Sequence, residues 1–153
     1  EWSRLPAGGY RLNTDSCSII ISNSYYNNVV EKSINDYKIF CFNGKVDSIM
    51  VCTGREKGHP DFYFYDTNWK RLYYQYAYLE KKNQIEKPYN LDEMLKIAER
   101  LSKGHSHIRV DLFDIDNNIY FGELTFFDNS GFDTDISYET DSKWGEEIIL
   151  PRR

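Results

Sequence analysis

The sequence has few cysteines, lacks an excess of positive charge and has no long apolar run, and each shortage excludes a class of protein. Its 153 residues include three cysteines, which form no CxxC pair or Cys/His zinc spacing and leave one thiol over in any disulfide scheme. The formal net charge of -5 disfavours non-specific binding to nucleic acid or to an anionic membrane. No apolar run approaches the roughly 20 residues of a membrane span, and no signal peptide is recognisable. We therefore expect a reduced, cytoplasmic setting, no transmembrane segment and no nucleic-acid partner.

The sequence is rich in aromatic residues. Hydrophobic residues make up 41% and aromatic residues 16% of the chain, with 13 tyrosines, and so much apolar surface favours a packed globule over disorder. The length suits one domain. We find no internal repeat and no Gly/Ser linker. Residues 1–29 are rich in turn formers and are predicted to be a poorly specified lead-in to a domain at residues 30–153.

The hydrophobic periodicity predicts an α+β fold. Residues 36–55 are expected to form a hairpin, because apolar runs flank Asn43-Gly44, a pair that suits a type I′ turn. Further strands are expected at 18–21 and within 62–78, where Asp66 and Asn68 suit a turn. Residues 90–104 are expected to form a helix that has Asn90 as its N-cap, an apolar stripe and Gly104 at its end. Hairpins with one packed helix give a mixed layer architecture.

The stretch 109–126, RVDLFDIDNNIYFGELTF, predicts a second hairpin with charges where core residues are expected. If residues 116–118 form a three-residue loop, Asp111 lies opposite Glu123, and Arg109 lies opposite Thr125. Two ionised carboxylates about 4 Å apart repel by roughly 4 kcal/mol at an effective dielectric near 20. A raised pKa, the neighbouring Arg109 or a divalent cation such as Mg2+ would each offset this repulsion. A solvated sheet face with weak surface ion pairs is the alternative.

Several of these segments together resemble a known family. The ordered series DYKIFCFNG, KPYNLDEMLKIAERLS, IRVDLFDIDNNIYFGELTFFDNSGF and DSKWGEEIILP, over roughly residues 30–151, is similar to the C-terminal part of the TupA-like branch of the ATP-grasp superfamily, which occurs in gene clusters for teichuronopeptide and other bacterial surface polysaccharides. The resemblance implies an ATP-grasp subdomain of an ATP-dependent ligase. Such an enzyme couples a carboxylate to an amine through an acyl phosphate, with ATP and Mg2+.

The resemblance also implies roles for particular residues. Asp111 and Glu123 look like the acids that hold Mg2+ on the ATP phosphates, with Thr125 where the superfamily usually has Asn. Arg109 looks like the arginine that steadies the transferred phosphoryl group. Asp36, Lys38 and Arg55 resemble residues that reach the phosphates or a bound carboxylate, with Lys38 in place of an arginine.

One part of the expected enzyme has no counterpart in the sequence. ATP-grasp enzymes close over the phosphates with an upstream subdomain that carries a lysine and a Gly-rich loop, and the first 30 residues match neither. We therefore expect half of a nucleotide clamp, inactive alone, whose partners in the complete enzyme are carboxylate and amine or sugar substrates of surface polysaccharide. The alternatives are a non-catalytic glycan-binding or interaction module and a sugar-transferring enzyme of the same clusters.

Two further sequence features, a histidine pair and an aromatic run, each allow more than one role. His105 and His107 are spaced to point the same way from a strand, which allows metal binding, a loop end or a pH-sensitive surface pair. The aromatic run from Phe62 to Tyr78 suits either a sheet core or a platform on which sugar rings stack.

Overall fold

A computed structural model describes residues 2–4, 10–13, 18–21, 34–54, 58–75, 83–131 and 133–150. The strands are β1 (Trp2–Arg4), β2 (Tyr10–Asn13), β3 (Ser18–Ile21), β4 (Asp36–Phe42), β5 (Lys45–Thr53), β6 (Asp61–Tyr65), β7 (Arg71–Leu72), β8 (His107–Ile115) and β9 (Asn118–Thr125). The helices are α2 (Leu91–Ser102), the short 3-10 helix η3 (Asp128–Gly131) and α3 (Tyr138–Glu147). None of the described helices is long and apolar enough to cross a membrane.

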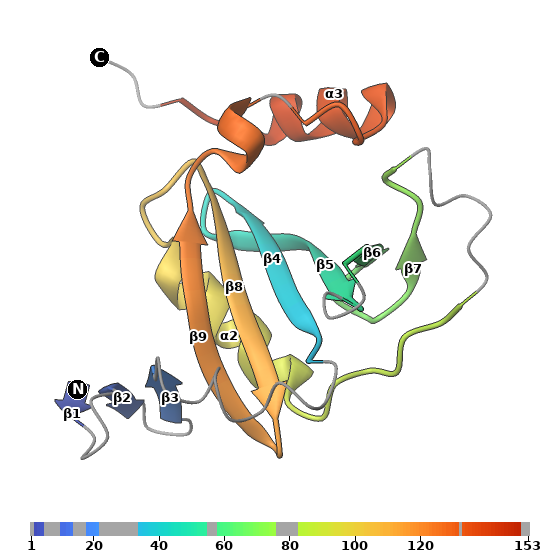
Figure 1. The fold of residues 1–153 in the computed structure, drawn as a ribbon. Helices are drawn as coiled ribbons and strands as arrows, with labels where there is room; N and C mark the ends of the chain where they lie inside the picture. The colour runs from blue at the N-terminus through green and yellow to red at the C-terminus, as the bar shows by residue number, and fades with distance from the viewer. Residues whose placement is uncertain are drawn as a thin grey trace.

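The described strands join in one sheet, in the order β1-β2-β3-β9-β8-β4-β5-β6-β7. Neighbouring strands are antiparallel except β3 and β9, which are parallel. Helix α2 lies behind the central strands, and α3 runs across the end of the sheet that is opposite the β8–β9 turn (Figure 1). This arrangement confirms the predicted α+β class.

The β4–β5 hairpin and helix α2 follow the sequence prediction closely. Asn43 and Gly44 have positive φ angles of 51° and 79°, as a type I′ turn requires. In α2, the predicted apolar stripe buries Met94, Ile97 and Ala98. Asn90 stands at the N-cap position, but its side chain makes no cap hydrogen bond, so the predicted capping role is wrong.

The two faces of the sheet carry separate apolar clusters. The face toward α2 holds the larger one, which includes Tyr63, Tyr65 and Trp69, so the described part of the 62–78 aromatic run is largely core. On the opposite face Phe40, Phe42, Phe64 and Ile136 pack together with Trp144 of α3 against them. Helix α3 was not predicted as an element. Its attachment to this second face positions the site described below.

The register of the β8–β9 hairpin differs from the predicted one between the turn and Gly122. The turn has two residues, Asp116 and Asn117, with φ angles of 51° and 60°, and Phe113 pairs with Tyr120 rather than with Phe121. A shift in register then follows, after which Arg109 pairs with Thr125 as predicted. The three-residue loop was therefore wrong. The extra residue lies in a β-bulge instead.

Residues 1–29 contribute more regular structure than the predicted lead-in. Strands β1 and β2 lie within its turn-rich first part, and β3 confirms the strand expected at 18–21. Strand β3 joins the sheet through β9, with Ile19 paired to Ile119. The described parts of this segment therefore extend the same sheet rather than standing apart from it.

Candidate functional site

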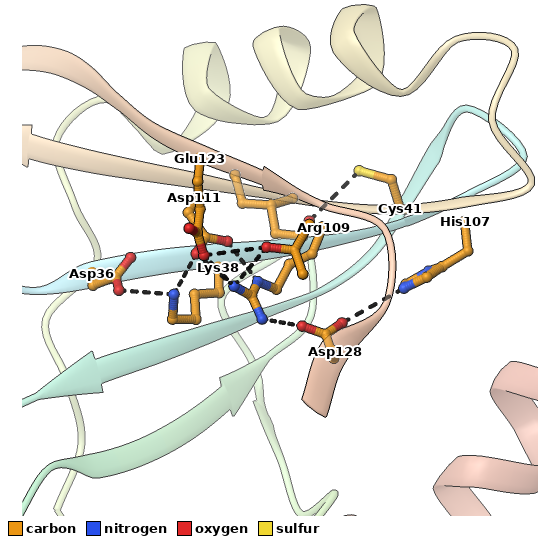
Figure 2. Close-up of polar contacts among 10 residues, drawn as sticks. Asp36, Lys38, Cys41, His107, Arg109, Asp111, Glu123 and Asp128 are labelled. Carbon is orange, nitrogen blue, oxygen red and sulfur yellow. Dashed lines mark hydrogen bonds and ion pairs between the residues drawn. The ribbon is translucent and has the colours of Figure 1, made fainter. Parts of the chain in front are cut away.

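A line of charged side chains crosses the face of the sheet that lies away from α2. Strands β4 and β8 are antiparallel neighbours that pair Lys38 with Asp111 and Phe40 with Arg109. Because paired residues share a face and residues two apart on a strand share it as well, Asp36, Lys38, Arg109 and Asp111 all lie on one side. Figure 2 shows these four side chains turned toward one another across the two strands.

Lys38 connects the two carboxylates at the buried end of this line. Its Nζ lies 2.9 Å from Asp36 Oδ2 and donates a hydrogen bond to Asp111 Oδ2. Lys38 is 7% exposed and Asp111 is 2% exposed. A charge buried this deeply is tolerated only when it is paired and hydrogen-bonded. Each of these charges therefore depends on the others.

Arg109 lies at the centre of the predicted site. Its Nε and Nη2 donate to the two oxygens of Asp111 over 2.6 and 2.8 Å, which is a bidentate contact. Its Nη2 also donates to Glu123 Oε1 and Thr125 Oγ1, at 2.9 Å in each case. Arg109 is thus the cation that offsets the repulsion between the two acids.

The charge of Arg109 is stabilised by these contacts. Burial disfavours the charged form, but the hydrogen bond from Arg109 to Asp111 and the charges of the surrounding acids outweigh it and raise the pKa of the guanidinium above its ordinary value. A permanently charged group held in position on a sheet is suited to binding an oxyanion.

The bulge in β9 places Glu123 beside Arg109. Gly122 and Glu123 together lie opposite the single residue Asp111, since Val110 pairs with Leu124 and Leu112 with Phe121. A Cβ atom on Gly122 would lie 3.0 Å from the main-chain oxygen of Asp111. The close approach of the two strands therefore favours glycine at this position. The Glu123 side chain itself is 62% exposed.

Asp128 completes the network and was missed by the sequence analysis. It accepts a hydrogen bond from Arg109 Nη1 through Oδ1, and its Oδ2 lies 3.6 Å from Nε2 of His107. The His107 ring packs against Phe42, with ring centroids 4.7 Å apart. His107 is therefore in contact with the charged network, whereas His105 packs edge-on against Phe126. Strand periodicity could not reveal Asp128, because it follows β9 in η3, where the chain bends back.

A cavity of about 860 Å³ opens between this face of the sheet and α3. Lys38, Arg109 and Glu123 line one part of it, and Phe40 and Trp144 line another. Trp144 stacks on Phe40 with ring centroids 4.8 Å apart. The charged line and the aromatic contact of α3 therefore belong to one concave site, the form typical of small-molecule sites.

Helix α3 is attached over the cavity through Asp47. The carboxylate of Asp47 accepts hydrogen bonds from Lys143 Nζ and, over 3.0 Å, from the indole nitrogen of Trp144. Burial disfavours the charge of Lys143, but its contacts with Asp47 and Tyr74 outweigh burial and raise its pKa above the usual range. One carboxylate on β5 thus joins α3 to the sheet.

The residues predicted to hold Mg2+ are brought together without forming a closed cage. Among the described residues, no three His, Cys, Asp or Glu side chains are grouped so as to hold a metal ion. Mg2+ commonly takes only one or two protein carboxylates and fills its other positions with phosphate oxygens and water. The chemistry of Asp111 and Glu123 therefore fits a metal that arrives with phosphate. The predicted phosphate-binding residue Arg55 lies outside the described residues.

Comparison with known proteins assigns the chain to a family. A family model described as TupA-like ATPgrasp matches residues 11–149. The chain belongs to this family. Membership in it supports an ATP-dependent, ligase-like function. No curated protein and no solved structure matches the chain.

Proposed function

We propose that the protein is part of an ATP-dependent carboxylate–amine ligase acting in the synthesis of bacterial surface polysaccharide. ATP would supply the phosphoryl group that activates the carboxylate as an acyl phosphate. The amine nitrogen then bonds to the carbonyl carbon, phosphate leaves with the bonding electron pair, and a proton passes from nitrogen to solvent. The observation that carries the proposal is the family match over residues 11–149, which includes the whole charged network.

The two cations of the network have the chemistry for phosphate. Lys38 and Arg109 line the cavity, and both are paired with carboxylates that hold them in place. Side chains fixed in this way need little reorganisation when a phosphoryl group arrives. In this proposal Arg109 stabilises the phosphoryl oxygens, and Lys38, positioned by Asp36, adds a second positive charge.

The acids would hold the metal. Asp111 and Glu123, with the hydroxyl of Thr125 beside them, would bind Mg2+ together with the phosphates, and the ion would supply further neutralisation of phosphate charge. Thr125 donates to Glu123 Oε1 over 3.2 Å and so orients that carboxylate. Glu123 is the accessible member of the pair, because its side chain is more than half exposed.

The test is turnover of the Glu123→Gln variant in the complete enzyme, because this chain is expected to supply only half of the nucleotide clamp. ADP formation is measured with Mg2+, ATP and mixtures of carboxylates and amines, and Mg-ATP binding is measured by calorimetry. Loss of a group that stabilises transferring phosphate lowers turnover by roughly 100- to 1000-fold. The matched control is Asp116→Asn, which removes an exposed carboxylate from the turn of the same hairpin and should keep wild-type turnover. Wild-type turnover in Glu123→Gln would contradict the metal assignment, and a complete enzyme that never binds Mg-ATP would contradict the proposed function.

A further inference from the structure

The wall of the cavity near α3 contains a buried polar side chain, Gln75. Gln75 lines the cavity and is 5% exposed, yet its side-chain oxygen has no hydrogen-bond partner in the described part of the chain. A buried carbonyl without a partner costs roughly 1–3 kcal/mol. A ligand that brings an N–H or O–H donor to this oxygen would remove that cost.

Backbone contacts hold an acidic segment beside Gln75. Gln75 forms an antiparallel bridge with Ile136, and the amide of Ser137 donates to the carbonyl of Tyr74 over 2.8 Å. These contacts place Ile136 and Ser137 next to Tyr74 and Gln75, with Asp133 and Asp135 just before them in the chain. Ser137 then caps α3, so the first turn of the helix starts from the same place.

Three carboxylates from this segment and from α3 line the cavity, namely Asp133, Asp135 and Asp141. No described basic side chain forms an ion pair with any of them. The two cations that line the cavity are already engaged, Lys38 with Asp111 and Arg109 with its own acids. The wall near Gln75 therefore has a surplus of negative charge, which repels phosphate and attracts a cation.

We propose that this wall binds a primary amine in its ammonium form, with the positive charge facing Asp133, Asp135 and Asp141 and a donor group on Gln75. Assignment of this amine as the acceptor of the ligase rests on the proposed function, whereas the binding itself does not. The carboxylates supply attraction that is long-range and weakened by salt. The Gln75 carbonyl supplies a directional contact that selects a donor.

The test uses three matched pairs of small molecules that differ in the amine. Glucosamine is compared with N-acetylglucosamine, ethanolamine with ethylene glycol, and putrescine with butanediol, by calorimetry at low salt and without ATP. We expect the amine to bind at least about tenfold more tightly than its neutral counterpart in one or more pairs. Equal binding within every pair, or no binding by any amine, overturns the proposal.

Variants then locate the site. Replacing Asp135 and Asp141 together by asparagine should weaken amine binding by about five- to tenfold, while the control Asp116→Asn should leave it unchanged. Gln75→Met keeps a side chain of similar length without the carbonyl, and it should weaken binding by about fivefold while leaving the melting temperature unchanged or raised. Asp135 and Asp141 are exposed, so the asparagine variants test the location of the amine site even if Gln75→Met does not fold. Equal loss in the control overturns the proposal.

The outcomes of this test and of the ligase test are separable. Amine binding that depends on these acids, together with a complete enzyme that never binds Mg-ATP, would contradict the ligase and leave the amine site standing. Turnover that depends on Glu123, in a protein that binds no amine probe, would contradict the amine site and leave the ligase standing.

Discussion

Neutralising Asp111 should destabilise the protein far more than neutralising Glu123, although both carboxylates bind the same guanidinium. Asp111 is 2% exposed and accepts hydrogen bonds from Lys38 and, twice, from Arg109. Asp111→Asn keeps the shape and leaves the buried Lys38 and the partly buried Arg109 facing an amide. Removal of one partner from a buried charge network costs about 3–5 kcal/mol. In a domain of this size, that corresponds to a fall in melting temperature of roughly 10 °C.

Glu123→Gln is the matched comparison. Its side chain is 62% exposed, and an exposed ion pair contributes under about 1 kcal/mol. Thermal melting and urea denaturation of both variants measure the difference. A double-mutant cycle with Lys38→Met isolates the contribution of Lys38, which should couple to Asp111 by about 1–3 kcal/mol. An Asp111→Asn variant as stable as wild type, or a Glu123→Gln variant as unstable as Asp111→Asn, would refute this account of the buried network.

Two further predictions concern stability. Gly122→Ala should lower the free energy of unfolding by about 1–3 kcal/mol, because its Cβ would lie 3.0 Å from the main-chain oxygen of Asp111. The control Gly145→Ala in α3, where a Cβ meets nothing within 4 Å, should be neutral or stabilising. Equal melting temperatures of the two variants would contradict the close approach of the strands. Burial raises the pKa of the Cys41 thiol from 9.0 to about 12, so the folded state keeps a proton that the unfolded state loses, and the stabilisation is present below pH 9.0 and lost as the pH rises toward about 12. The free energy of unfolding, measured by urea denaturation, should therefore fall as the pH rises across this alkaline range, and Cys41→Ala should make that fall shallower by up to about 1.4 kcal/mol per pH unit. The same pH dependence in wild type and Cys41→Ala would count against the shift.

The elements that could be predicted from sequence are those whose signals are local. Asn43-Gly44 specifies its turn through backbone conformation alone, and the apolar stripe of α2 specifies the face that packs. Helix α3 has a weaker signal, because Thr140 is its single buried residue and its packing relies mainly on Trp144. Its existence depends on a surface that other elements provide.

The candidate site divides in the same way. Arg109, Glu123 and Thr125 could be predicted from the sequence to lie together, because strand alternation and pairing are regular. The convergence of Arg109 with Glu123 and Thr125 is confirmed, although the roles of these residues stay predictions. Asp128 and Gln75 could not be predicted, because one follows a bend after β9 and the other meets the cavity through a bridge to residue 136. Contacts made by irregular segments carry no periodic signal.

The bulge at Gly122 divides the β8–β9 hairpin into a part next to the turn and a part that carries the charged network. Deleting Gly122 while inserting one residue into the Asp116-Asn117 turn leaves the residue count between Arg109 and Thr125 unchanged, so the charged end keeps its pairing. The pairs between turn and bulge, Phe113 with Tyr120 and Leu112 with Phe121, are kept as well, so neither side chain of β9 changes face. Changes of turn length in related chains are thus compatible with an unchanged charged network whenever a compensating residue is gained or lost at this one point of β9.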